Sequence, residues 1–281
     1  MAILLGENNY GKQRVRILQV ARHADRHDIK ELTVGIRLEG DFEAAHTTGD
    51  NRKVLPTDTM KNTVYALAKS HSIKSPEEFC LVLTDHFLTH NPQVSRVRIE
   101  AAETLWTRLA VEGKPQPHTF TGSSSEKRTA VLAATRKEKT LHAGIDGLVV
   151  LKTTDSAFEN FLKDEFTTLK EDRNRILATS VRATWLYREN AAEFDSIWQV
   201  VRQTLLEAFA AHGSASLQHT LYAMGEAALR KFPGIREIHL SLPNKHYNLV
   251  DLSPFQMENP KEVFLPTDEP HGLIEATVRN D

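Results

Sequence analysis

Three stretches of the sequence carry polar side chains at places where a folded chain usually buries apolar ones. Residues 56–63 open a helical pattern, residues 217–220 lie early in another, and residues 242–247 follow an apolar strand pattern. Free backbone N–H groups at a helix start can bind a ligand, and a loop held by a sheet often carries function. Each stretch is therefore a candidate ligand-binding segment. The alternatives are helix capping by Thr57 or Asp58 and an ordinary turn in the third stretch.

Other residue types that often carry chemistry point to structural roles. The sequence has none of the short motifs of common nucleotide-binding, hydrolytic or metalloprotease sites. His86 and His90 have the spacing of paired metal ligands, but the helical pattern ends at Asn91 and Pro92, so we expect surface histidines. Cys80 lies beside an apolar stripe and is expected in the core. We therefore expect no metal and no organic cofactor.

Composition and charge limit the classes of function. The 281 residues include 35 basic and 37 acidic side chains, a net charge of −2, so no overall basic field attracts nucleic acid or an anionic membrane. A small ligand is the better expectation. The single cysteine excludes an intrachain disulfide and fits a reducing compartment. Apolar runs are too short to span a bilayer, and the N-terminus lacks a secretory pattern, so we expect a cytoplasmic protein.

The elements that position these residues follow one order in each half of the chain. In the first half, apolar residues alternate on both sides of a polar turn at residues 22–30, which predicts two antiparallel strands. A helical period follows at residues 60–68, and Ser75 begins a second helix as a capping serine before proline. Strand alternation returns at residues 97–101 and again near residues 120–132.

The second half repeats this order of two strands, two helices and two strands. Ser216 is a possible cap for its second helix. The predicted extended segments lie near residues 148–150, 181–187, 238–242 and 247–252, and the predicted helices near residues 197–209 and 221–228.

The doubled order predicts an α+β protein of two units, residues 1–137 and 138–281. Each unit is expected to have a four-stranded antiparallel sheet with a helix pair on one face. Such a sheet leaves unpaired backbone groups along two edges, which invites pairing with another copy. An oligomer that closes the sheets into a barrel would remove these edges.

Five motifs follow one another along the chain: Tyr10-Gly11-Lys12, Thr57-Asp58 with Lys61-Asn62-Thr63, residues 151–156 running to Phe158, residues 164–169, and residues 244–247. In type and order these motifs resemble the urate oxidase (uricase) family. The resemblance extends from about residue 10 to residue 255 and implies the tunnelling fold, with two such units per chain. It also implies a homotetramer whose active sites are shared between subunits.

The resemblance also implies a binding site for urate. Arg175 and Gln218 correspond to the pair that clamps the purine, and Phe158 corresponds to the ring stacked beneath it. Urate offers adjacent C=O and N–H groups, which suit an amide, while a guanidinium fork suits an anion. Leu217 stands where the family usually has valine, and its backbone N–H is the expected contact. Asp58 is expected to contribute through its backbone N–H.

A proton relay and an oxygen site complete the implied active site. Lys12, Thr57 and His246 correspond to the relay, with Thr57 coming from the neighbouring chain. Lys12 must be neutral to act as a base, which requires burial or a nearby cation. Thr57 and Asn244 correspond to the pair that holds O₂ or water above the ring. In this family urate itself supplies electrons to O₂, so the reaction gives 5-hydroxyisourate and hydrogen peroxide without a cofactor.

Two alternatives share the same fold. A pterin-pathway enzyme would need a zinc cluster or an anchoring glutamate, and Gln218 and the lone cysteine do not match these requirements. A purine-binding protein without activity would not need the relay residues. Production of peroxide from urate would separate these alternatives from a urate oxidase.

Overall fold

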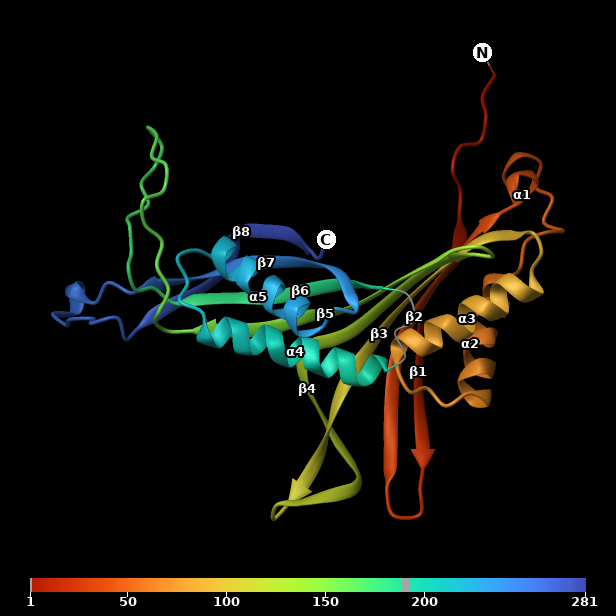
Figure 1. Cartoon of the computed structure of the whole chain (residues 1–281), viewed down its shortest axis with the longest axis horizontal. Coiled ribbons are helices and arrows are strands. Elements are labelled where there is room, and N and C mark those ends of the chain that lie inside the picture. Colours follow the sequence, from red (N-terminus) through yellow and green to blue (C-terminus); the bar gives the residue numbers. More distant parts are fainter. Residues whose placement is uncertain (1, 189–192) are drawn as a thin grey trace. The chain divides into compact units, whose positions relative to one another are not determined.

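The computed structural model describes residues 2–188 and 193–281, without the side chains of residues 123 and 124. The chain divides into two compact units (Figure 1). One comprises the chain up to Gly144 with a short segment that ends at Ser196, and the other runs from Ile145 to Arg188 and from Ile197 to Asp281. The division at residue 137 that the sequence predicts stays a prediction.

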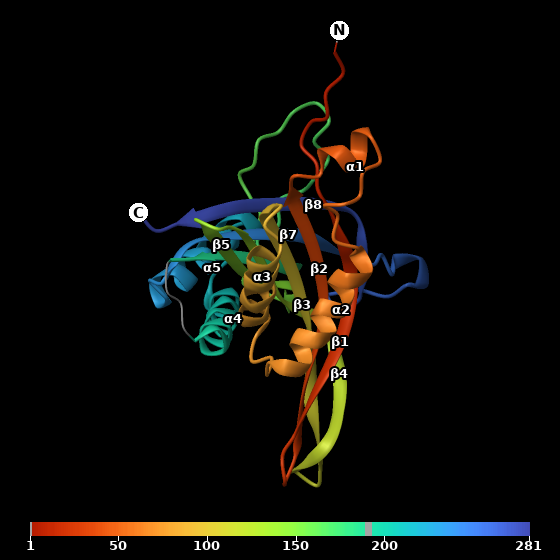
Figure 2. The ribbon, with the colours of Figure 1, turned by 90° about the vertical axis from the view of Figure 1, so that its right-hand side faces the viewer.

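The first unit has the predicted order of elements, with one short extra helix. Its elements are β1 (Tyr10–Arg22), β2 (His27–Gly40), α1 (Glu43–Thr47), α2 (Thr57–Ser70), α3 (Pro76–His90), β3 (Val94–Val111) and β4 (Lys114–Thr135). The strands lie in the order β1-β2-β3-β4, and neighbours are antiparallel. Figure 2 shows α2 over β1 and α3 over β3, on one face of the sheet.

The core of the first unit lies between this helix pair and the sheet. Alternate residues of β2 and β3 point into it, and the helices contribute one apolar face each. Its fully enclosed side chains include Leu32, Val34, Ile36, Leu38, Val97, Ile99, Met60, Val64, Leu83 and Phe87. Cys80 is buried in the same cluster, as expected, and burial raises the pKa of its thiol.

The second unit also follows the predicted order. Its elements are β5 (Lys139–Lys152), which begins in the first unit, then β6 (Leu177–Tyr187), α4 (Phe194–Ala211), α5 (Leu217–Lys231), β7 (Ile235–Leu249), the 3₁₀ turn η1 (Ser253–Phe255) and β8 (Phe264–Arg279). The strand order is β5-β6-β7-β8, and β7 pairs antiparallel with both β6 and β8. Helix α5 packs on β7 and β8.

Two boundaries differ from the sequence prediction. The turn predicted at residues 22–30 is shorter, because β1 extends to Arg22 and β2 begins at His27. The segment at residues 247–252, predicted as the last strand, is in a strand only at residues 247–249, the end of β7, and the last strand is β8. Polar residues interrupt the apolar alternation of β7 and β8, so the hydrophobic pattern does not predict how far these strands extend or that they pair. Within the described residues, none of the helices has the length and apolarity needed to cross a membrane.

Candidate active site

Tyr10 ties the start of α2 to strand β1 in the first unit. Its hydroxyl accepts a hydrogen bond from the backbone N–H of Leu55 at 2.8 Å, and its ring meets Phe42 edge-on at 4.8 Å. Burial raises the pKa of the Tyr10 phenol, which stays neutral. This contact places the beginning of α2, where Thr57 lies, beside the beginning of β1. The sequence pointed to Tyr10 only as part of a motif.

A β-bulge directs the side chain of Lys12. Lys12 pairs with Ile36 and Val15 pairs with Val34, so β1 has one residue more than β2 between these pairs. Arg14 takes up the extra length with a φ of 58°. Gly11 lies directly before Lys12. A Cβ on Gly11 would be 1.8 Å from the carbonyl oxygen of Ile36, so only glycine fits there. Lys12 therefore shares the helix-covered face with Ile36.

The start of α2 has no side-chain cap. Helix α2 begins at Thr57, and Pro56 precedes it without a side-chain hydrogen bond to the first turn. The carboxylate of Asp58 instead binds Lys61 and accepts from the Asn62 amide at 2.9 Å. The hydrogen bond from Lys61 lowers the pKa of Asp58, and the charge of Lys12 lowers it further. The capping alternative for residues Thr57 and Asp58 is therefore wrong, since neither side chain caps α2 in the described part of the chain.

Three segments of the second unit meet at the start of α5. The N–H of Ala157 donates to Ser214 O at 2.7 Å, and the N–H of Arg175 donates to Ser156 O at 2.8 Å. The N–H of Phe158 donates to Asp172 O at 2.7 Å. Phe158 and Arg175, which are 17 positions apart in sequence, are thus held next to the residues that lead into α5.

The Arg175 guanidinium lies over the Phe158 ring, 5.4 Å from its centroid. The same ring stacks on Phe161 at 4.9 Å. Burial lowers the pKa of Arg175, and the nearby Asp172 carboxylate opposes this shift, so the guanidinium keeps its charge. Its buried Nε has no hydrogen-bond partner among the described residues. A half-buried cation with a spare donor beside an aromatic ring is suited to a planar anion.

Gln218 projects from the first turn of α5. Ser216 caps this helix, and its hydroxyl accepts from the N–H of His219 at 3.1 Å, as the sequence predicts. Leu217 is buried and anchors the turn, while Gln218 is exposed. Because the cap uses the N–H of His219, the N–H groups of Leu217 and Gln218 are left for other acceptors. The amide of Gln218 and these N–H groups share one end of the helix.

Asn244 and His246 lie in strand β7 and not in the loop that the sequence suggested. Asn244 pairs with Thr179 of β6 and Gly272 of β8, and His246 pairs with Thr267. The turn interpretation of Asn244 is therefore wrong. Both side chains are half-buried and lie two positions apart on β7, at the place where the register between β7 and β8 shifts.

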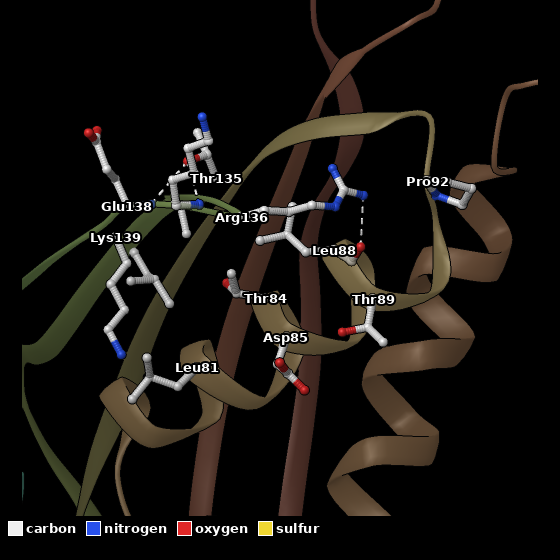
Figure 3. Close-up of a pocket in the computed structure, with 13 residues that line it drawn as sticks. Leu81, Thr84, Asp85, Leu88, Thr89, Pro92, Thr135, Arg136, Glu138 and Lys139 are labelled. Atoms are coloured by element: carbon white, nitrogen blue, oxygen red, sulfur yellow. Dashed lines mark hydrogen bonds between the residues drawn. The ribbon is translucent and has the colours of Figure 1, made fainter.

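A cavity of about 790 Å³ in the first unit holds none of the predicted site residues (Figure 3). It lies between α3 and the end of β4. Arg136 in its wall donates to the carbonyls of Leu88 and Asn91 at the C-terminal end of α3 and to the carbonyl of Val94 at the start of β3. The candidate active site therefore lies at the segments described above and not at this cavity.

The histidine pair at the end of α3 lies outside the segments that hold the predicted site residues. The rings of His86 and His90 stack at 4.4 Å, and His90 is exposed. Across the described part of the chain, no group of three or more histidine, cysteine or acidic side chains could hold a metal ion.

The chain matches the family model "Uricase" over residues 8–133 and 141–275. This chain belongs to the uricase family. A uricase of Arthrobacter globiformis is 47% identical over 99% of this chain and 91% of its own length. A uricase of Dictyostelium discoideum is 38% identical over 99% of this chain and 98% of its own length.

Solved uricase structures confirm the fold. The crystal structure of the Arthrobacter globiformis uricase has a TM-score of 0.95 and 47% identity over 100% of this chain and 96% of that chain. The structure of a uricase from Bacillus fastidious, at 23% identity, has a TM-score of 0.83 over 98% of this chain and 94% of that chain. The predicted α+β class with tandem tunnelling-fold units is confirmed, and so is the urate oxidase function. The roles of individual residues stay predictions.

Proposed function

We propose that this uricase oxidises urate with O₂ and water to 5-hydroxyisourate and hydrogen peroxide, using its own side chains and no cofactor. This activity is supported by full-length similarity to uricases at 38–47% identity. The meeting of Phe158, Arg175 and the α5 start within one unit supports the binding site.

Arg175 and Gln218 are the proposed clamp for the purine. The guanidinium of Arg175 supplies donors and positive charge to the urate anion. The Gln218 amide both donates and accepts, which matches an edge with neighbouring N–H and C=O groups. The backbone N–H of Leu217 adds a donor from the helix start, where the helix dipole favours an anion. Phe158 provides the stacking surface.

Lys12, Thr57 and His246 are the proposed proton relay. Lys12 accepts a proton from urate, the Thr57 hydroxyl passes it, and His246 orients Lys12 or carries the proton onward. Lys12 is half-buried and lies close enough to Asp58 for their charges to interact, so the first unit presents Lys12 and the α2 start together. The backbone N–H of Asp58 is a proposed contact, because its carboxylate is engaged by Lys61 and Asn62.

Asn244 and Thr57 are proposed to hold O₂, and later water, above the ring. Deprotonated urate gives electrons to O₂, and a hydroperoxide forms at C5. Hydrogen peroxide then leaves, and water adds to give 5-hydroxyisourate. Urate loses two electrons, and O₂ with two protons becomes hydrogen peroxide, so the reaction balances without another oxidant.

The proposed assembly is a homotetramer in which Thr57 of one chain completes the site of another. The proposed location is the cytoplasm. Large apolar side chains on the second unit support burial against another copy, since Leu162, Phe166 and Phe255 are 93%, 81% and 70% exposed. Strands β1 and β8 end the strand orders of their units, which leaves edges for pairing.

The test uses purified protein that has been treated exhaustively with a chelator. When urate and O₂ are added, the protein should consume urate, measured by its absorbance, and form one molecule of hydrogen peroxide for each urate consumed. Activity that disappears on chelation and returns with added iron or copper would contradict the cofactor-free reaction. Binding of urate without any peroxide would favour the inactive purine-binding alternative, and turnover of a pterin in place of urate would favour the pterin-pathway alternative.

A further inference from the structure

Thr179 of strand β6 is completely buried, and its hydroxyl has no hydrogen-bond partner among the described residues. Most buried hydroxyl groups in proteins are hydrogen-bonded, because leaving one unpaired in the interior is costly. Valine would fill the same volume without that cost. An unpaired threonine hydroxyl at this place therefore points to a partner that takes it up in another state of the site.

The sheet places one polar side chain directly across from Thr179. Thr179 lies directly opposite Asn244 in the ladder between β6 and β7. Further along the same ladder Ala183 lies opposite Leu240, whose side chain faces Gly225 of α5. Thr179 and Asn244 are an even number of positions from that pair, so both point to the helix-covered face.

The two side chains are within reach of each other. Opposite residues in an antiparallel pair have Cβ atoms about 4.5–5.5 Å apart, so rotation of the amide is enough to make a hydrogen bond. On the other side of Asn244 lies Gly272, where an added Cβ would be 3.9 Å from the Cβ of Asn244. Asn244 thus has a hydroxyl on one side and a residue without a side chain on the other.

We propose that Thr179 is a positioning residue that orients the amide of Asn244 for the oxygen step. Its hydroxyl donates to Oδ1 of Asn244, which leaves the Nδ2 hydrogens to face O₂ or water above urate. This inference rests on the proposed role of Asn244. Thr179 itself touches neither urate nor oxygen.

The experiment compares Thr179→Val, which removes the hydroxyl at constant volume, with Thr179→Ser, which keeps it. Steady-state rates are measured at varied O₂ with saturating urate, and urate affinity is measured without O₂. Thr179→Val should lower kcat/KM for O₂ by about tenfold or more and leave urate affinity unchanged, while Thr179→Ser should restore most of the loss. Thr184→Val is the control, because Thr184 is on the same strand and points to the other face.

The results separate this inference from the proposed function. If the unaltered protein makes no peroxide from urate, the proposed function is wrong. If Asn244→Ala slows the oxygen step and Thr179→Val does not, the positioning role alone is wrong. Equal damage from Thr179→Ser and Thr179→Val would also overturn it, because that pattern reports packing. In an Asn244→Ala background, Thr179→Val should have no further effect. If valine disturbs the fold, Thr179→Ala also removes the hydroxyl and takes the place of Thr179→Val in the comparison with Thr179→Ser.

Discussion

Gln218 is the residue proposed to distinguish urate from other flat heterocycles. Its amide can donate and accept at once, whereas a carboxylate only accepts. It is exposed at the first turn of α5, so a change of its side chain leaves the buried anchor Leu217 in place. Specificity at this position can therefore be altered without altering the fold.

Gln218→Glu should weaken urate binding by about tenfold or more, because it removes a donor and places a negative charge beside an anionic ligand. Calorimetry of urate binding without O₂ measures this change. Gln116→Glu is the control, because it adds the same charge in the hairpin that β3 and β4 form in the first unit. Unchanged affinity in Gln218→Glu would remove Gln218 from the clamp.

Helices α3 and α5 both begin with a serine cap, but only α5 leads into the candidate site. Ser216 Oγ accepts from His219 and Ser75 Oγ accepts from Glu78, each at 3.1 Å. The two caps therefore form a matched pair for separating stability from function.

Alanine in place of either serine should lower the free energy of unfolding by about 1 kcal/mol. Only Ser216→Ala should also raise KM for urate, since it loosens the turn that carries Gln218. Thermal unfolding and steady-state kinetics of both variants test this expectation. A rise in KM of similar size in Ser75→Ala would show that general loosening, and not the position of Gln218, is responsible.

A buried ionic cluster joins α3, β4 and the start of α4 within the first unit. Arg128 donates to Glu77 at 2.8 Å and also binds Asp195. Burial raises the pKa of Glu77 to about 7, and Arg128 opposes this shift. Because the folded-state pKa of Glu77 lies above its unfolded value, the stabilising contribution of Glu77 is complete below the ordinary glutamate pKa of 4.5 and is lost as pH rises through about 7.

Arg128→Met should cost about 3–5 kcal/mol near pH 8, where it leaves a buried carboxylate without its cation. The loss should be smaller near pH 5, because Glu77 is then protonated. Glu77→Gln should remove this pH dependence, whereas Glu43→Gln, at an exposed position, should leave it unchanged. Urea unfolding at both pH values is the measurement. An equal loss at both values would show that Glu77 does not titrate in this range.

At the scale of the whole molecule, the proposed site residues come from both units, and the relay residue His246 lies in the second unit with the proposed clamp. Lys12 and Thr57 belong to the first unit, and Arg175 and Gln218 belong to the second. The family resemblance implies that Thr57 reaches the site of a neighbouring chain. A shared site makes activity depend on which chains assemble together.

Mixing two inactive variants tests the shared site. Thr57→Ala and Arg175→Ala should each be nearly inactive alone, and co-expression should restore up to about a quarter of full activity. In a two-fold pair that mixes at random, half of the pairs contain one intact site of two. No recovery in proven mixed oligomers would place Thr57 and Arg175 of the same chain in one site. Light scattering measures the oligomer.

The sequence by itself determined the order of elements, both serine caps and the family, because periodicity, capping and motifs are local properties of the chain. It placed Asn244 in a turn, since Pro243 and polar neighbours hide a strand whose partners, Thr179 and Gly272, lie far away in sequence. The bulge beside Lys12 and the join between Ser156, Arg175 and Ser214 likewise depend on backbone pairing between distant segments. Only the tertiary structure decides such pairings, because a hydrogen bond between remote strands leaves no periodic signal in either strand.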